Sequence, residues 1–310
     1  MKEVSENPDK RTDAPRGTSL GGLVLRSALV TVAAALAAGA LVFSLIGCIS
    51  PRAYMDMCRS FGAYGIAVVY ADEALDRASH DEPCDESGCD YITLASAAVE
   101  VADAAYSEKP TAAHAEYLYD FCCAYLSASC HTRHSAAMDE YYESEYAHSP
   151  ELLCTVYGYD YYVFATRITA MRGMQSEPYG GGLGDGFDGC ATYGDALDAY
   201  AASLLGMCDF AAPVDYFYPV FGLAAYADGS DDVSAIGDGT ALHAFYSDLT
   251  AVAGEMESGF EKAFVQYGAY RLASALESAE GSAEFESVWT EEVASDAYAA
   301  YVTTIKQIKK

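Results

Sequence analysis

The chain has 310 residues, of which 17 are Lys or Arg and 46 are Asp or Glu. The net charge of −29 argues against nucleic acid as a partner, because binding to phosphates requires basic patches that displace counterions. The charge also repels anionic lipid headgroups, so cations and basic partners are the ligands that electrostatics favours. A solvated acidic surface is the simplest reason for such a charge.

The first feature along the chain is an apolar stretch from Ser27 to Pro51, which contains no charged residue and is bounded by Arg26 and Arg52. Because a membrane-spanning helix needs about 20 mostly apolar residues, we expect residues 27–50 to form a single transmembrane helix. Basic residues are more frequent before this stretch than after it, which predicts a cytoplasmic N-terminus. The sequence therefore predicts a signal-anchored, single-pass protein of the cell membrane with an extracytoplasmic C-terminal domain.

Two other interpretations of the apolar stretch stay open. Leu45 to Cys48 resembles the bacterial lipobox, in which the cysteine is acylated after cleavage, so Cys48 is a lipidation candidate. The long polar lead and the length of the apolar run favour a retained helix instead. Ordinary cleavage and release is the third interpretation. In all three, the bulk of the chain is exported.

Two compositional features indicate a bacterial protein. Asn7 is the only asparagine and precedes Pro8, so the chain has no N-glycosylation sequon. Scarce Asn, Lys and Gln beside abundant Ala, Gly and Asp are typical of GC-rich coding, and the 26 tyrosines run against that bias. We infer that the tyrosines are selected.

The cysteines should form disulfides if the domain is exported. Nine cysteines follow Cys48. Because nine is odd, at least one of them is free, forms an intermolecular disulfide or pairs with Cys48 itself. Cys84 and Cys89 bound a short loop and are a candidate pair. Cys122 and Cys123 cannot pair with each other, because adjacent Cα atoms lie about 3.8 Å apart, below the usual disulfide range of about 4.4–6.8 Å. Each needs a separate partner or a place in the core.

The exported part has helical periodicity nearly throughout. Apolar residues step at three and four positions from Met57 to Leu75 through Phe61, which predicts a helix ended by the Pro- and Gly-marked stretch 80–90. A further break is expected near Pro110. Three more helices are expected over 111–130, 136–147 and 150–171.

A Gly-rich stretch from Gln175 to Gly189 is the longest non-helical segment and predicts a flexible loop or linker. Helices are expected after it over 192–207 and from Pro213 to Tyr226, followed by a second loop over 228–239.

The cleanest apolar pattern runs from Leu242 to Phe264 in steps of three and four. Gly254 and Gly259 weaken this pattern, and we expect the helix to continue through them. A turn at 280–281 and a return helix over 285–305 would then form an antiparallel helical hairpin at the C-terminus.

No segment alternates as a strand does, so the expected fold class is all-α. Cys190 and Cys208 flank a helix of about 27 Å and cannot bond to each other. If oxidised, they reach other segments, so we favour one covalently tied ectodomain over two independent ones. The expected segments are a disordered cytoplasmic tail (1–26), a transmembrane helix (27–50), a first helical block (51–173), a Gly-rich loop (174–190) and a second helical block (191–310).

No motif identifies a cofactor or a catalytic centre. The chain lacks G-x-S-x-G, S-x-x-K and H-E-x-x-H, and no cofactor is expected. Gly184 to Gly189 matches G-x-G-x-x-G, but no strand precedes it and its two aspartates would repel phosphate. Cys130, His131 and His134 are weak candidates for a zinc site that lacks a fourth ligand.

Tyrosines between positions 141 and 162 are the candidate binding residues, since tyrosine offers a flat apolar face with a polar tip. They are Tyr141, Tyr142, Tyr146, Tyr157, Tyr159, Tyr161 and Tyr162. Packing between helices is the alternative role for them. We therefore expect a membrane-anchored bacterial surface module that binds a protein or carbohydrate and is not an enzyme. A motif-free exported hydrolase and a structural envelope lipoprotein are the alternatives.

Overall fold

The computed structural model describes most of the chain after residue 48 and part of the segment before it. The described residues are 24–34 apart from Arg26, then 39, 42, 49–78, 86–133, 150–207, 217–228, 233, 236, 239–278 and 289–308. The chain divides into two compact units, Met1–Ser50 and Pro51–Lys310. Among the described residues, none of the helices has both the length and the apolar character needed to cross a bilayer, and most of 35–48 lies outside them.

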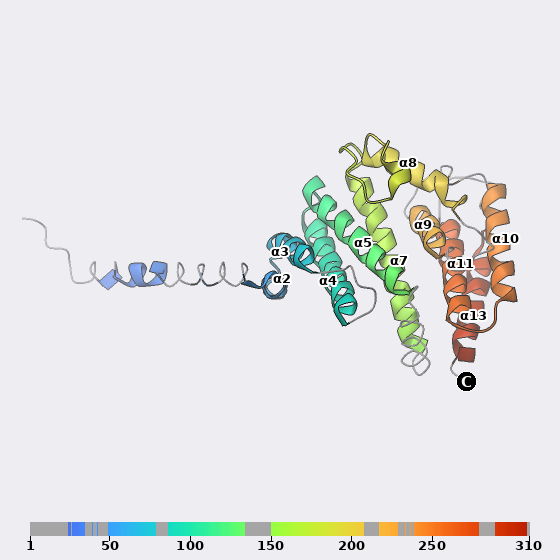
Figure 1. Ribbon diagram of the computed structural model, residues 1–310, viewed down its shortest axis with the longest axis horizontal. Coiled ribbons are helices and arrows are strands. Elements are labelled where there is room, and N and C mark those ends of the chain that lie inside the picture. Colours follow the sequence, from blue (N-terminus) through green and yellow to red (C-terminus); the bar gives the residue numbers. More distant parts are fainter. Residues whose placement is uncertain are drawn as a thin grey trace, which may run out of the picture. The chain divides into compact units, whose positions relative to one another are not determined.

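The described part of the chain is all-α, as predicted. Its only β-type pairing is an isolated bridge between Pro178 and Thr192. The described α-helices of the second unit are labelled in Figure 1. They are α2 (Pro51–Ser60), α3 (Tyr64–Arg77), α4 (Glu86–Glu108), α5 (Ala112–Arg133), α7 (Pro150–Gly173), α8 (Tyr193–Leu204), α9 (Phe217–Ala227), α10 (Gly239–Glu255), α11 (Phe260–Ser278) and α13 (Glu291–Ile308). A short 3₁₀ helix, η2 (Asp185–Phe187), lies between α7 and α8.

Among the described helices of the second unit, the early ones pack mainly on their neighbours in the chain, whereas α9 packs mainly on α11, across α10 in the sequence. The contacts run from α2 to α3, α4, α5 and α7, and continue from α7 to α9, α11 and α13. Helix α8 contacts both α7 and α9, and α10 contacts α11. Helix α7 therefore lies between α5 and α9 and links the two blocks that the Gly-rich loop separates in the sequence.

The core has two kinds of packing. On α4, which packs on both α3 and α5, small residues three or four positions apart are fully buried, namely Ala95, Ala98 and Ala102. Farther along the chain, large aromatic rings fill the space between α7, α9 and α11, among them Phe164, Phe221 and Phe264.

The predicted continuous helix over 57–75 is wrong. The chain turns at Gly62, whose φ of 70° lies in the left-handed region that favours glycine. Gly62 N–H bonds to the carbonyl of Arg59, and Ala63 N–H bonds to the carbonyl of Cys58, which together form a Schellman motif that ends α2. Phe61, expected in the apolar stripe, is therefore 79% exposed.

The predicted uninterrupted helix from Leu242 to Phe264 is also wrong, because α10 ends at Glu255 and α11 begins at Phe260. Lys262 Nζ donates a hydrogen bond to the carbonyl of Met256, just past the end of α10. Two glycines of low helix propensity flank the break, and packing of α11 on α9 and α13 outweighs the local periodicity.

Helices α11 and α13 pack against each other in opposite directions. Tyr267 contacts Tyr301, whereas Tyr270, one turn later on α11, contacts Tyr298, one turn earlier on α13. This pair is the C-terminal hairpin, although its first helix is α11 alone. Trp289 lies before α13 and is buried.

The other expected elements agree with the structure where it describes them. The stretch 111–130 lies in α5, 150–171 in α7 and 192–207 largely in α8. Thr192 begins α8 with a capping box, since its hydroxyl accepts from the Asp195 N–H and the Asp195 carboxylate accepts from the Thr192 N–H. The short helix expected over 136–147 lies outside the described residues.

Candidate functional site

Four of the predicted tyrosines lie on the central helix α7, and each hydroxyl donates a hydrogen bond to another segment. Tyr157 donates to the carbonyl of Phe260 over 3.2 Å, and Tyr159 donates to the carbonyl of Ser96 over 3.0 Å. Tyr161 and Tyr162 donate to carboxylates, as described below. Tyr141, Tyr142 and Tyr146 lie outside the described residues.

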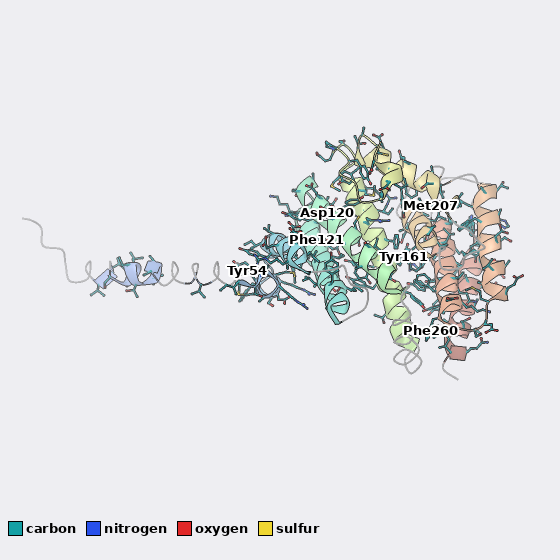
Figure 2. All side chains as sticks on the ribbon, in the orientation of Figure 1. Tyr54, Asp120, Phe121, Tyr161, Met207 and Phe260 are labelled. Carbon is teal, nitrogen blue, oxygen red and sulfur yellow. The ribbon has the colours of Figure 1, made fainter. Side chains whose placement is uncertain are left out.

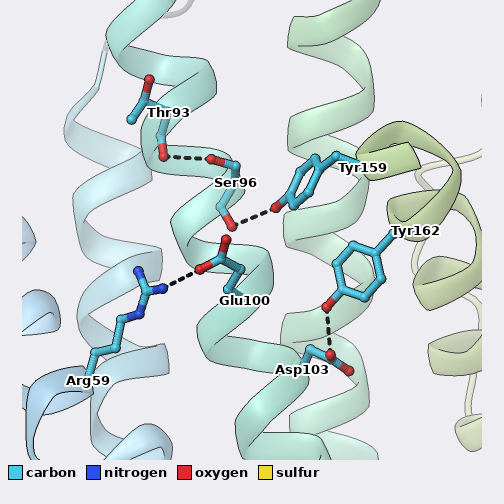
Figure 3. Close-up of polar contacts among 7 residues, drawn as sticks. All are labelled: Arg59, Thr93, Ser96, Glu100, Asp103, Tyr159 and Tyr162. Atoms are coloured by element: carbon cyan, nitrogen blue, oxygen red, sulfur yellow. Dashed lines mark hydrogen bonds and ion pairs between the residues drawn. The ribbon is translucent and has the colours of Figure 1, made fainter. Parts of the chain in front are cut away.

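The two carboxylate acceptors belong to different neighbours of α7. Tyr161 donates to Asp228, just after α9, over 2.9 Å, and its position on α7 is labelled in Figure 2. Tyr162 donates to Asp103 on α4 over 2.6 Å, and Figure 3 shows this bond beside that from Tyr159. Burial raises the pKa of Tyr161 and of Tyr162, so both phenols stay protonated at neutral pH.

These four tyrosines therefore connect helices. Tyr157 and Tyr161 are each 5% exposed, and Tyr159 and Tyr162 are half-buried. Their rings contribute to packing, so they do not form an exposed aromatic patch. A binding role for the tyrosine cluster stays a prediction.

A second polar group on α7 was not singled out by the sequence. Arg167 is 7% exposed, and its guanidinium lies over the rings of Phe164 and Tyr200, with distances of 5.1 and 5.3 Å from Cζ to the ring centroids. Its Nη2 donates a hydrogen bond to the Tyr200 hydroxyl over 3.0 Å. Its Nε is buried without a hydrogen-bond partner among the described residues.

Two cysteines of α5 complete the surroundings of Arg167. Burial raises the pKa of the Cys122 thiol well above its usual value. Burial also raises the pKa of the Cys123 thiol, although the Arg167 charge works in the opposite direction. Burial lowers the pKa of Arg167 itself, but Tyr200 and the thiols raise it by more, so the guanidinium stays charged. Neutral thiols cannot balance that charge.

Two other arginines of the second unit have an acceptor that Arg167 lacks, although the Nε of Arg271 is also buried without a hydrogen-bond partner among the described residues. Arg271 lies over the Tyr161 ring at 3.8 Å and forms an ion pair with Asp228, with Nη2 and Oδ2 separated by 3.6 Å. Arg172 donates to the carbonyl of Tyr226 over 2.8 Å. Among the described residues, no carboxylate forms an ion pair with Arg167. A buried guanidinium without an acidic partner is unusual, because desolvation costs several kcal/mol per ion.

The Gly-rich loop covers this group. Its base is held by hydrogen bonds from Tyr179 N–H to the carbonyl of Ala191 and from Tyr193 N–H to the carbonyl of Glu177. Its tip is held by Tyr119 of α5, whose hydroxyl donates to the carbonyl of Gly181 over 2.6 Å. A short loop with pinned ends and its own packing is an Ω-loop, a class that frequently carries function.

The loop also contributes to the walls around Arg167. Phe187, at the end of η2, is buried and packs edge-on against Tyr200, with ring centroids 6.0 Å apart. Gly182 has a φ of 97°, and a Cβ added there would lie 2.8 Å from the Tyr119 hydroxyl oxygen and 3.2 Å from Cys123 Sγ. Gly182 thus lets the loop lie directly on α5. We call Arg167, Tyr200, Tyr119, Cys123 and the covering loop the Arg167 site.

The metal and disulfide candidates stay predictions, because their side chains lie outside the described ones. Among the described residues, no group of three or more His, Cys, Asp or Glu side chains could hold a metal ion. His134 and the side chains of Cys130 and His131 lie outside that part of the structure, as do Cys48, Cys84 and the side chain of Cys89.

The described cysteines form no disulfide. Cys58, Cys122, Cys123 and Cys190 are free thiols. Cys122 is fully buried and Cys123 packs against the core. Of the two alternatives for these cysteines, a separate disulfide partner or a place in the core, the second therefore holds for both. Comparison with known protein families, curated proteins and solved structures found no match to this chain.

Sequence reasoning found the loop but not the arginine. Arg167 lies in an ordinary helical pattern, and nothing local shows that a distant ring from α8 and two thiols from α5 surround it. One feature of the sequence could have indicated the site. The many glycines over 180–189 allow the loop backbone to approach another helix closely.

Proposed function

We propose that the chain is a membrane-anchored, extracytoplasmic binding module and that its ligand carries a carboxylate group that pairs with Arg167. The anchor is the apolar stretch 27–50, whose length and flanking charges carry that part of the proposal. The buried guanidinium without an acidic partner is the single observation that carries the binding part.

A carboxylate is the ligand group that best fits this environment. Arg presents several N–H donors in a planar fork that matches a carboxylate bidentately. Of these donors, Nη2 is used by Tyr200 and Nε has no partner among the described residues. The aromatic rings of Phe164 and Tyr200 keep the surroundings apolar, which strengthens a charge-assisted hydrogen bond.

A doubly charged phosphate fits less well. Besides burial, the groups that shift the pKa of Arg167 are phenols and thiols, none of which can carry a positive charge, so the guanidinium supplies the positive charge of the site. The protein as a whole has a net charge of −29, which adds long-range repulsion for multivalent anions. A single negative charge on an otherwise neutral or apolar molecule meets both conditions, and a saccharide carboxylate belongs to this class.

Ligand entry requires the Gly-rich loop to lift from α5. The loop tip is held by the Tyr119–Gly181 hydrogen bond, and Phe187 fills the space beside Tyr200. Loops covering ligand sites are drawn from the less stable parts of a fold. Opening would expose Arg167 and leave the helices in place.

The test is ligand-induced stabilisation of the full chain in detergent, with acetate and benzoate as probes and inorganic phosphate as comparison. Either carboxylate should raise the melting temperature with the logarithm of its concentration. The variant Arg167→Met should lose that response while staying folded, because replacing a buried unpaired charge by an apolar side chain is neutral or stabilising.

The matched control is Arg172→Met. Arg172 lies on the same helix, and its guanidinium bonds to a backbone carbonyl. This variant should keep the response to carboxylates. If neither carboxylate stabilises the wild-type chain, or if Arg167→Met responds as the wild type does, the proposed ligand class is wrong.

A further inference from the structure

Exposed apolar side chains are concentrated at the start of the second unit. Phe61 is 79% exposed, and Ile66 and Val69 of α3 are 52% and 51% exposed. Among the described residues after position 50, the other exposed large apolar side chains, Met207 and Tyr298, lie far along the chain from this group and from each other. We call Phe61, Ile66 and Val69 the α3 apolar surface.

The geometry of the turn and helix explains why these three side chains face outward. The Schellman motif at Gly62 leaves Phe61 outside the packing of α2 on α3. On α3, Ala67, Val68 and Ala71 occupy the buried face. The outer face is apolar only in the first two turns, because its later positions are Asp72, Glu73 and Asp76. Only about half of each of the Ile66 and Val69 side chains is buried, so packing on the protein explains only part of their apolar character.

The local charge and the position in the chain both point to a bilayer. Residues 51–70 contain Arg52 and Arg59 against a single acid, Asp56, in a chain whose net charge is −29. Arg59 pairs with Glu100 of α4, and Figure 3 shows this ion pair, while Arg52 is exposed. Aromatic and apolar residues next to arginine are typical of segments that lie at a membrane interface. This stretch directly follows the apolar segment that ends at Pro51.

We infer that the α3 apolar surface rests in the interface of the bilayer, so that the first helices of the ectodomain lie against the membrane. The inference depends on the membrane anchoring proposed above. A second copy of the chain is a poorer occupant, since a stable protein interface buries about 800 Å² on each partner, far more than three side chains provide. A bilayer needs no such area, because an anchor already holds the surface close to the lipid at high effective concentration.

The experiment measures quenching of tryptophan fluorescence by brominated lipid. The full chain is placed in phosphatidylcholine nanodiscs whose acyl chains carry bromine, and the variants are Phe61→Trp and Val69→Trp. The wild-type chain has one tryptophan, Trp289, which is 3% exposed and supplies the background signal. Each variant should lose about half of its added emission relative to unbrominated discs, because interfacial side chains reach about 5–10 Å into the headgroup and acyl boundary.

The matched control is Tyr298→Trp, which places tryptophan at an exposed aromatic position on α13. Its added emission should be unchanged by bromine. A chain that fails to co-migrate with the discs contradicts the membrane anchor itself. A chain that co-migrates but whose Phe61→Trp emission is no more quenched than that of Tyr298→Trp overturns the inference and leaves the anchor standing. Emission from Phe61→Trp that shifts with protein concentration and not with bromine would assign this surface to a second copy.

Discussion

The two sides of α7 both carry tyrosine hydrogen bonds, but they differ in how much ring packing accompanies them. Toward α4 and α5, tyrosine hydroxyls bond across the helices: Tyr159 to a carbonyl, Tyr162 to Asp103, and Tyr125 of α5 to Asp160 over 2.8 Å. Toward α9 and α11, two hydroxyl bonds, from Tyr157 to the Phe260 carbonyl and from Tyr161 to Asp228, are accompanied by dense ring packing. Phe221 of α9 lies within 6.0 Å of four other aromatic rings, measured between centroids, and two of these rings belong to α7.

This difference bears on two separate properties: the rotation and shift of α7 about its axis, and the free energy that holds α7 in place. Hydroxyl hydrogen bonds are directional, and each contributes only about 0.5–1.5 kcal/mol net, so on the α4 and α5 side they mainly fix how α7 is rotated and shifted. Ring packing buries much more apolar area and is less directional, so the α9 and α11 side supplies more of the free energy of folding. Helix α7 is therefore oriented by hydroxyl bonds on both sides and stabilised mainly by ring packing on the α9 and α11 side.

The largest effect should come from the ring side. Phe221→Ala removes a 1% exposed ring that touches α7 and α11, and it should reduce the free energy of unfolding by about 3–5 kcal/mol through lost burial and a cavity. Urea unfolding of the full chain, followed by helical circular dichroism, measures this. Phe61→Ala is the control, since this exposed ring should change stability by less than about 0.5 kcal/mol. A loss below about 1.5 kcal/mol for Phe221→Ala would contradict the assignment of the main stabilising free energy to this side.

A smaller effect is expected for the buried hydrogen bond on the other side. Tyr125→Phe keeps the ring and removes the hydroxyl that donates to Asp160, a residue only 3% exposed. The expected loss is about 2 kcal/mol, because hydrogen bonds to charged groups contribute about 1.5–3 kcal/mol. The same unfolding measurement applies. Equal stability of Tyr125→Phe and wild type would mean that this bond contributes nothing net.

A half-buried hydrogen bond on the same side should matter less. Tyr162→Phe removes the donor to Asp103, and solvent can replace part of that interaction. We expect a loss of about 1 kcal/mol. Tyr162→Ala should cost more, since it also removes the ring, and the difference between the two variants separates hydroxyl from ring. If Tyr162→Phe lost as much as Tyr162→Ala, the ring would have no packing role on this side.

The smallest effect concerns Asp120 of α5. Desolvation and the neighbouring carboxylates of Glu116 and Asp72 raise the pKa of Asp120 to about 6, from an ordinary value of 3.8. Because the folded chain holds this proton more tightly than the unfolded chain, stability from this group is present below about pH 4 and is lost as the pH rises through about 6.

The variant Asp120→Asn tests this pH dependence. It should be more stable than wild type at pH 7 by less than about 1 kcal/mol, because Asp120, although partly desolvated, has enough exposed surface for solvent to screen its charge. At pH 4 the two chains should be equally stable. A constant difference across the whole range would show that the carboxylate of Asp120 does not titrate as assigned.

Most helices could be predicted from sequence, whereas the position of two breaks could not. Apolar steps of three and four residues reflect a helical face that must be buried, so α5, α7 and α8 were predictable to within a few residues. The same steps continue across 61–63 and 256–259, where the chain turns. Periodicity reports which side of a segment is apolar. It does not report whether the chain must bend to bring that side against a neighbour.

The candidate site was predictable only in part. Tyr159 and Tyr162 were singled out for their composition, and their partners Ser96 and Asp103 lie on α4, far away in the sequence. Arg167 carried no local signal at all. A residue's chemistry can be read from its side chain, but its partners depend on which helices meet.

The sequence by itself determined that the described part of this protein is helical, that its longest loop is rich in glycine, and that an uncharged apolar stretch precedes an acidic domain. These properties depend on local propensity and on composition, which need no knowledge of distant contacts. Only the tertiary structure decided that α7 lies between two kinds of packing, that Arg167 is buried beside thiols without an acid, and that Phe61 faces outward. Burial and pairing are long-range properties, because they arise where residues from different helices exclude water together.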